Sequence, residues 1–271
     1  MEFCVQKNGA LEYLTAPALS CGGAAHAFST RFGGVSEGAL ANLNLGVHRG
    51  DKPENVLENY RILGAAVGFF PEDTVFTVQR HTDIIRRVGK SNRGEGLFRP
   101  VPEVCDGIIT DEENVALCCF GADCATILLY DPVRRAIGAV HSGWRGTAQG
   151  IAKKAVEAMV REFGCKPENI RAAIGPSIGQ CCFETDFDVP QAMHDALGAQ
   201  ADACVQKRGS KYFVDNKALC QIWLTLAGVT QIDTAGACTM CQPDRFWSHR
   251  VTGGNRGAQA AIIMLQGGDG K

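Results

Sequence analysis

Short, continuous apolar runs bounded by turn residues recur along this chain, and each of them predicts a buried β-strand. The two clearest runs are residues 115–120 and 136–140. Further strands are expected at residues 26–30, 74–78, 84–88, 170–174, 211–214, 230–235 and 258–265. Apolar side chains at helical spacing instead predict helices over residues 54–67, 147–163, 189–197 and 217–227. Strands and helices therefore alternate along the chain, with the two clearest strands near its middle.

This alternation predicts an α+β fold, in which mixed β-sheets are flanked by helices. We find no linker-like change of composition and no repeat of fixed period among the 271 residues. We therefore expect a single domain over residues 1–271, with a core of considerable size.

Charge and cysteine content narrow the function classes. The net charge of −2 gives no sign of the excess of basic residues that binding to nucleic acid or to an anionic membrane requires. No apolar run approaches the ~18 residues of a membrane span. The first ten residues lack the pattern of a secretory signal, and the 13 cysteines then favour reduced thiols in the cytoplasm. We expect a cytoplasmic protein that acts on a small molecule, with no obligate protein partner evident.

Three residues with metal-binding side chains follow β runs directly. His81 and Cys124 each come just after a predicted strand, and His141 follows residues 136–140. One thiolate and two imidazoles suit zinc or copper, and three protein ligands leave a fourth position open, as in catalytic zinc sites. The spacing alone also allows three unrelated strand-end residues, each satisfied by its own neighbours.

Other polar residues beside turns are candidates for substrate binding or catalysis. Arg31, Arg145 and Arg250 follow short turns and could each meet an anion such as phosphate, or could form ordinary salt bridges. Asn44 carries a side-chain amide in an alternating polar and apolar segment, and we count it among the substrate-binding candidates. Asp106, Asp123 and Glu184 could orient a ligand imidazole or act as a general base, or could simply cap turns.

Two pairs of cysteines are not expected to form a metal site. Cys238 and Cys241 form a Cys-x-x-Cys motif, but the sequence shows no partner pair for a structural zinc. Cys181 and Cys182 are adjacent and would point in opposite directions in an extended chain. We therefore interpret all four as buried or incidental thiols.

Five segments, in order along the chain, resemble the laccase-domain family, which is also known as the YfiH-like polyphenol oxidase or purine nucleoside phosphorylase family. They are Gln79-Arg80-His81, Asp106-Gly107-Ile108, Gly121-Ala122-Asp123-Cys124, Ala139–Gly146 with its His-Ser-Gly-Trp-Arg-Gly string, and Ala173–Gly179. The resemblance covers nearly the whole chain and implies the layered YfiH-like fold. It also implies that His81, Cys124 and His141 bind one zinc ion. The chain departs from the family pattern near its end, at Ser248-His249-Arg250 and Gly254-Asn255-Arg256-Gly257.

The resemblance implies a zinc-dependent enzyme that cleaves adenosine, inosine or methylthioadenosine with phosphate, and that also deaminates adenosine. Copper-dependent oxidation of phenols is the family's other activity, but six histidines cannot supply a usual multi-copper cluster once two of them bind the first metal. Two further alternatives remain open from the residues themselves. One is a metal-free cysteine hydrolase with Cys124 as the nucleophile, and the other is a non-enzymatic interaction protein.

Overall fold

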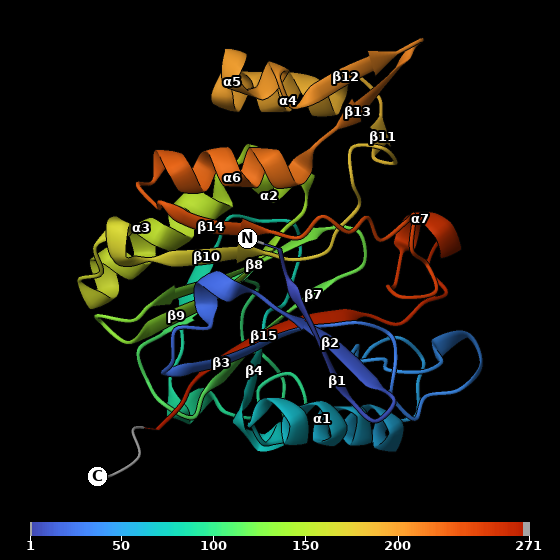
Figure 1. The fold of residues 1–271 in the computed structure, drawn as a ribbon, viewed down its shortest axis with the longest axis vertical. Helices are drawn as coiled ribbons and strands as arrows, with labels where there is room; N and C mark the ends of the chain where they lie inside the picture. The colour runs from blue at the N-terminus through green and yellow to red at the C-terminus, as the bar shows by residue number, and fades with distance from the viewer. Residues whose placement is uncertain (1, 268–271) are drawn as a thin grey trace.

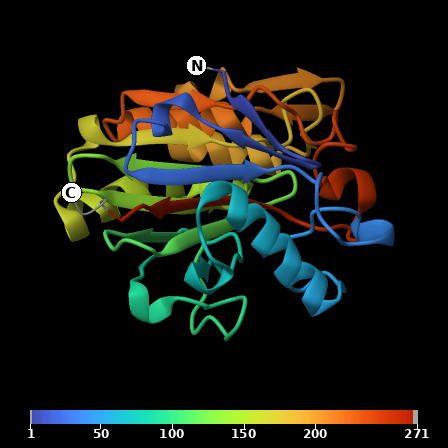
Figure 2. The same ribbon diagram turned by 60° about the horizontal axis from the view of Figure 1, so that its bottom comes forward.

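In the computed structural model, which describes residues 2–267, two β-sheets pack face to face between layers of helices (Figure 1). The turned view in Figure 2 shows helix α1 covering one side of this sandwich, with the yellow and orange helices on the opposite side. The layers therefore run from helix to sheet to sheet to helix. This arrangement confirms the predicted α+β class of mixed sheets flanked by helices.

The strands and helices have the following bounds. The strands are β1 Cys4–Asn8, β2 Leu11–Thr15, β3 Ala24–Ser29, β4 Thr74–Phe76, β5 Ile85–Arg87, β6 Gly107–Thr110, β7 Ala116–Gly121, β8 Ala125–Asp131, β9 Ala136–Ser142, β10 Arg171–Ile174, β11 Glu184–Thr185, β12 Val205–Arg208, β13 Lys211–Val214, β14 Gln231–Thr234 and β15 Gln259–Leu265. The helices are α1 Pro53–Val67, α2 Trp144–Ala148, α3 Ile151–Phe163, α4 Asp188–Leu197, α5 Ala199–Asp202, α6 Asn216–Leu226 and α7 His249–Thr252.

Each large sheet mixes parallel and antiparallel pairs. The first has the strand order β1-β2-β3-β15-β7-β4, and the second has the order β14-β10-β8-β9-β6-β5. Within the second sheet, β8 and β9 pair antiparallel over their full length, whereas β10 and β14 run parallel. A smaller sheet, β11-β13-β12, lies with α4 and α5 at one end of the molecule (Figure 1).

The main core lies between the two large sheets. Phe28, Leu117 and Ile263 from the first sheet pack there with Leu128 and Ile137 from the second, all almost completely buried. Separate apolar clusters join the second sheet to α3 and α6, and the first sheet to α1. Both faces of each sheet are therefore covered, which explains why their central strands read as continuous apolar runs rather than as alternating ones.

Several elements differ from the sequence-based expectation, and the differences near the site and in the first large sheet are the clearest. Strand β8 was not predicted, because its apolar run begins only a few residues after β7 ends. The helix expected over residues 147–163 is two helices, α2 and α3, separated at Gly150, which adopts a left-handed φ of 74°. Strands β1 and β2, which are partly exposed, lie in a segment whose pattern predicted nothing. Across residues 2–267, no helix is both long enough and apolar enough to cross a membrane.

Candidate metal centre and adjoining cavity

The chain crosses from one large sheet to the other between β7 and β8, where the predicted metal ligand Cys124 lies. Strand β7 belongs to the first sheet and ends at Gly121, and β8 begins in the second sheet at Ala125. Only Ala122, Asp123 and Cys124 make this crossing, and Asp123 has a φ of 94°. Such a short connection holds Cys124 at a fixed position on the rim of the sandwich.

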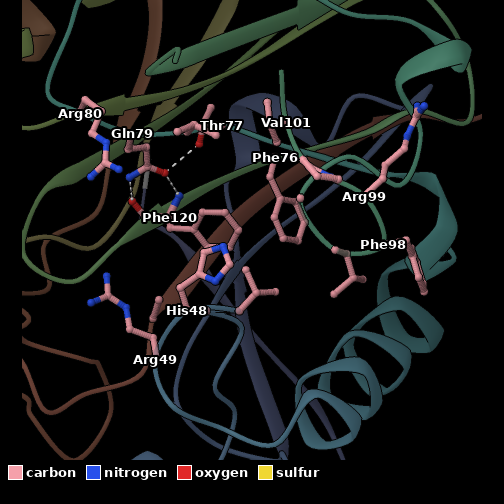
Figure 3. Close-up of a pocket in the computed structure, with 17 residues that line it drawn as sticks. His48, Arg49, Phe76, Thr77, Gln79, Arg80, Phe98, Arg99, Val101 and Phe120 are labelled. Atoms are coloured by element: carbon pink, nitrogen blue, oxygen red, sulfur yellow. Dashed lines mark hydrogen bonds between the residues drawn. The ribbon is translucent and has the colours of Figure 1, made fainter. Parts of the chain in front are cut away.

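A glutamine amide fixes the segment that carries His81. The side chain of Gln79 donates to the carbonyl of Phe120 at 2.8 Å and accepts the amide N–H of the same residue at 2.7 Å (Figure 3). The hydroxyl of Thr77 donates to the Gln79 oxygen at 2.8 Å. Because Phe120 is in β7, the residues after β4 are fastened to the strand that leads to Cys124.

The carboxylate of Asp106, which is fully buried just before β6, organises the same segment. It accepts the backbone N–H groups of Arg80, His81 and Thr82 at 3.1, 3.1 and 2.8 Å, and also the Thr82 hydroxyl. Burial alone would raise the pKa of this carboxyl, but hydrogen bonds from His141 and Thr82 hold the pKa well below its usual range. Asp106 is therefore a permanent anion beneath His81, whose φ of 61° is unusual for a residue with a side chain.

His141, in β9, lies between two acidic groups. Its Nδ1–H donates to Oδ1 of Asp106 at 2.7 Å, which leaves Nε2 available on the other side of the ring. Burial lowers the pKa of His141, but Cys124 and Asp106 together raise it to about 9. Positive charge is thus strongly favoured between Cys124 and this imidazole, whether a proton or a metal ion supplies it.

The three predicted ligands converge. Ligand atoms of His81, Cys124 and His141 all lie within 4.8 Å of one another. Nδ1 of His81 is buried and has no hydrogen-bond partner in the structure. Burial, followed by the neighbouring His141, lowers the pKa of His81 and so favours its neutral, ligating form.

Gly143, next to this cluster, leaves the space between the ligand atoms open. A Cβ at Gly143 would collide with Nδ1 of His81 and would lie 3.3 Å from Sγ of Cys124. An orphaned ring nitrogen, a thiol and a second imidazole held by a carboxylate together fit a transition-metal ion. His81, Cys124 and His141 are the residues that would hold it.

A cavity of about 330 Å³ opens beside the three residues. His81 and Cys124 form part of its wall together with Ala122, Asp123, Trp144, Ile178, Phe183, Asn216, His249, Arg250 and Arg256. This volume is within the range of small-molecule sites, and the wall combines aromatic, cationic and hydrogen-bonding groups. The space next to the candidate metal centre can therefore accept a small polar aromatic molecule.

Two arginines line the cavity, and the sequence analysis named only one of them, Arg250, as an anion-binding candidate. Burial, followed by repulsion from Arg49, lowers the pKa of Arg256 to about 10, and its Nε is buried without a hydrogen-bond partner. The backbone N–H of Arg250 donates to Asp123 at 2.7 Å, and its guanidinium donates to the carbonyl of Glu184. Arg256 was missed because the sequence analysis treated residues 254–257 only as a departure from the family pattern.

Arg31 and Asn44 lie elsewhere. The guanidinium of Arg31 donates to the carbonyls of Pro243 and Ala41, each at 2.8 Å, and lies over the ring of Trp247. Asn44 is fully buried, and its amide oxygen accepts the N–H groups of Gly46 and Ala258. These contacts support a role for both residues in holding loops together.

Arg145 and Glu184 lie near the cavity but do not line it. Arg145 is exposed, with its guanidinium 4.2 Å from the ring centre of Trp144, and within residues 2–267 it forms no ion pair with a carboxylate. Glu184 is exposed on β11, and the bond it makes toward the site is through its backbone carbonyl. Asp123 does line the cavity, and its other carboxylate oxygen accepts the Thr239 hydroxyl at 2.6 Å.

A second, larger cavity of about 730 Å³ borders the same segment from another direction. Gln79 and Arg80 line it, whereas the next residue, His81, lines the smaller one. Figure 3 shows His48, Arg49 and Arg80 on one side of this larger cavity and Phe98 and Arg99 on the other. It lacks the thiol and the imidazoles of the metal centre, so we place the chemistry in the smaller cavity.

Comparison with known proteins agrees with this geometry. Purine nucleoside phosphorylase YlmD of Bacillus subtilis is 34% identical over 244 residues, which cover 88% of this chain and 87% of the relative. The crystal structure of the Bacillus licheniformis hypothetical protein YfiH superposes with a TM-score of 0.91 at 32% identity, covering 97% of this chain and 99% of that one. YlmD from Geobacillus stearothermophilus gives a TM-score of 0.90 at 34% identity, with the same coverage.

The family model described as multi-copper polyphenol oxidoreductase laccase matches residues 25–266. That range includes every strand of the two large sheets except β1, β2 and the first residue of β3. It also includes the three converging ligand residues and the whole cavity wall. Sequence, fold and site thus lead to one assignment, and this chain belongs to the multi-copper polyphenol oxidoreductase laccase family.

Proposed function

We propose that this protein is a zinc-dependent purine nucleoside phosphorylase. The observation that carries the proposal is the convergence of His81, Cys124 and His141 at one wall of a cavity whose other walls are aromatic and cationic. The name purine nucleoside phosphorylase, which the Bacillus subtilis relative carries, supports the same reaction. The substrates would be a purine nucleoside and inorganic phosphate.

The apolar part of the cavity suits a purine base. Trp144, Phe183 and Ile178 contribute to its wall, and aromatic rings pack favourably against a flat heterocycle. Asn216 and His249 add hydrogen-bonding groups that could select among bases. The indole of Trp144 is in turn backed by the guanidinium of Arg145, which limits its freedom to move.

Arg256 is the best-placed group for phosphate. Its half-buried guanidinium faces the cavity and has an Nε donor without a partner, so an anion would satisfy both its charge and its hydrogen-bonding capacity. Arg145, at the rim, is a second candidate, because no carboxylate of the described residues neutralises it. The contacts of Arg31 support instead a role in fixing the adjacent loops.

In the proposed reaction, a phosphate oxygen forms a bond to C1′ of the ribose as the bond from C1′ to the base nitrogen breaks. The electron pair of that bond goes to the base, which takes up the proton that the attacking hydrogen phosphate gives up. Arg256 would hold the phosphate, and Asp123 would accept a hydrogen bond from the ribose or pass that proton from the phosphate to the base. A zinc ion at His81, Cys124 and His141 would contribute a Lewis acid with an open coordination position.

Adenosine deamination is the second reaction proposed for the same cavity. Water replaces the 6-amino group, and ammonia leaves with the proton that water loses. An open metal position beside a purine pocket supports this chemistry. The products separate the two activities, because phosphorolysis yields adenine and deamination yields inosine.

The test is to incubate the zinc-loaded protein with adenosine, inosine and methylthioadenosine, with and without phosphate, and to identify the products by mass spectrometry. We expect free base to appear only with phosphate, and Cys124→Ala to lose activity together with the metal ion of the three-residue centre. Cys118→Ala is the matched control, because Cys118 is buried in β7 away from the cavity. Base release without phosphate, or full activity of Cys124→Ala, would overturn the proposal.

A cysteine hydrolase is a second candidate, favoured by one specific arrangement. Cys124, His141 and Asp106 follow one another as a nucleophile, a base and an orienting carboxylate would, with the His141 ring held by Asp106 at 2.7 Å. Nδ1 of His81, which this mechanism leaves unpaired, argues for the metal. A chelated, metal-free protein that retains activity and loses it on alkylation of Cys124 would favour the hydrolase.

A further inference from the structure

Four cysteines meet near the cavity, at a place where the sequence predicted unrelated thiols. Cys181 and Cys182 lie in the turn after β10, and Cys238 and Cys241 lie in the turn after β14. Since β10 and β14 are parallel neighbours, the segments leaving their carboxyl ends run side by side. The expectation that the two pairs are separate was therefore wrong, because sequence spacing does not show which strands are neighbours.

The turns also bring adjacent cysteines to the same side. Cys181 and Cys182 are in a turn rather than an extended strand, so their side chains are not forced to opposite faces. The Sγ atom of Cys241 lies 3.4 Å from that of Cys182 and 3.7 Å from that of Cys181. All four Sγ atoms lie within 4.8 Å of one another.

These distances between sulfur atoms match four thiolates around one metal ion better than they match a disulfide. Four sulfur atoms placed tetrahedrally at ~2.3 Å from a zinc ion are roughly 3.8 Å apart, whereas bonded sulfurs are only ~2.05 Å apart. All four residues are free cysteines in the structure. The spacing is that of a site shaped for one soft cation.

The surroundings also favour a negatively charged cluster. The backbone N–H of Gly179 donates to Sγ of Cys238 at 3.2 Å. The ammonium group of Lys217, which is 7% exposed, donates to the carbonyls of Ala235 and Ala237, close to Cys238 in the chain. Four thiolates around a divalent cation carry an excess of negative charge, and a buried ammonium offsets part of it.

We propose that Cys181, Cys182, Cys238 and Cys241 form a second metal site that binds one zinc ion through four thiolates. Each thiol loses its proton to solvent as the ion binds. Four protein ligands close the coordination shell, so this zinc is structural and takes no part in the chemistry at Cys124. Cys181 and Cys241 are exposed, so the ion can enter from solvent.

The ion would join the two loops that carry part of the cavity wall. The loop after β10 supplies Ile178 and Phe183 to the cavity, and Thr239, between two of the cysteines, donates its hydroxyl to Asp123 at 2.6 Å. A further contact between the loops runs from the N–H of Thr239 to the carbonyl of Ser177 at 3.1 Å. Zinc binding at the four cysteines would therefore stabilise the position of Asp123 and of the apolar wall.

The test measures zinc per chain in the purified full-length protein by elemental mass spectrometry. We expect about two ions in the wild type and about one in Cys241→Ser and in Cys124→Ala. Cys4→Ser is the matched control for an exposed cysteine outside both sites and should keep the wild-type content. Wild-type zinc content in Cys241→Ser would overturn this proposal, whereas wild-type content in Cys124→Ala would overturn only the first site.

A second measurement does not depend on the folding of a variant. Cobalt(II) added to the metal-free wild-type protein should produce the strong thiolate-to-cobalt absorption of a tetrathiolate site, beyond what one cysteine can give. Zinc should also protect Cys181 and Cys241 from alkylation, as read by peptide mass spectrometry. Absence of that absorption, or alkylation of Cys181 and Cys241 that zinc leaves unchanged, would contradict the site.

Discussion

Nδ1 of His141 donates to the carboxylate of Asp106 at 2.7 Å, and the same carboxylate oxygen accepts the backbone N–H of His81 at 3.1 Å. One buried acid thus sets both the ring orientation of one proposed metal ligand and the backbone of another. Because Nδ1 is taken by Asp106, Nε2 is the atom of His141 that remains for a metal ion shared with Cys124. Carboxylates in this outer position typically determine how tightly a histidine site binds its metal.

We expect Asp106→Asn to weaken zinc binding at the centre of His81, Cys124 and His141 by about 10–100-fold. The amide removes the negative charge beside His141 and turns an NH₂ group toward the N–H donors of Arg80 and Thr82. Competition with a zinc-binding dye measures the affinity. The control is Asp111→Asn, which removes a surface ion pair with Arg87. An affinity unchanged in a folded Asp106→Asn protein would show that this carboxylate does not support the metal.

Arg256→Lys should raise the KM for phosphate by roughly 10–100-fold while kcat falls less, if phosphorolysis is the reaction. A lysine keeps the charge but loses the planar fork that binds two phosphate oxygens together. Initial rates over a phosphate series measure the effect, with the exposed Arg161→Lys as the control. A KM for phosphate equal to that of the wild type would remove Arg256 from the phosphate site and leave Arg145 as the candidate.

Local patterns were enough to predict most central strands and to single out His81, Cys124 and His141, but only the family resemblance implied that these three share a metal ion. The runs at residues 115–120 and 136–140 indicated buried strands because the sheets are covered on both faces, so the apolar runs are uninterrupted. Strand β8 was not predicted because only three residues separate it from β7. Those residues were interpreted as part of a ligand motif rather than as the connection between two strands. The loops carrying Arg256 and the four cysteines could not be placed at all, because their positions depend on which strands pair.

The buried histidine of β3 should make stability depend on pH. His26 accepts the N–H of Ala16 on Nε2 at 2.8 Å, and burial lowers the pKa of His26 from its usual 6.5 to about 4. Between these values the unfolded chain binds more protons than the folded one, so stability falls as pH falls from about 6.5 to about 4. The full loss is about 3 kcal/mol in the free energy of unfolding.

His26→Gln should flatten this part of the pH profile, because glutamine can still accept from Ala16 but does not titrate. Urea unfolding at a series of pH values gives the comparison. His194→Gln is a suitable control. The hydrogen bond to Asp202 raises the pKa of His194, so this histidine changes the pH dependence of stability only above about pH 6.5. An equal slope between pH 4 and 6.5 in wild type and His26→Gln would contradict the assignment.

Gly143→Ala should abolish zinc binding at the three-residue centre while leaving the fold intact. The φ of Gly143 is −70° and its ψ is 166°, which alanine adopts without strain, so the backbone gives no reason for instability. The added Cβ collides with Nδ1 of His81 and comes within 3.3 Å of Sγ of Cys124, so it occupies the space between the ligands. Gly236→Ala is the matched control, because a Cβ there meets nothing within 4 Å.

The measurement is the rise in melting temperature when zinc is added to the metal-free protein, together with the zinc content of each variant. A ligand that binds only the folded state stabilises it in proportion to the logarithm of its concentration. Wild type and Gly236→Ala should therefore gain stability equally, and Gly143→Ala should retain only the gain that comes from the four cysteines. Adding Cys241→Ser to Gly143→Ala should remove that remainder, because the double variant then lacks both sites. If Gly143→Ala gains as much as the wild type and keeps its zinc content, His81 and Cys124 do not share an ion.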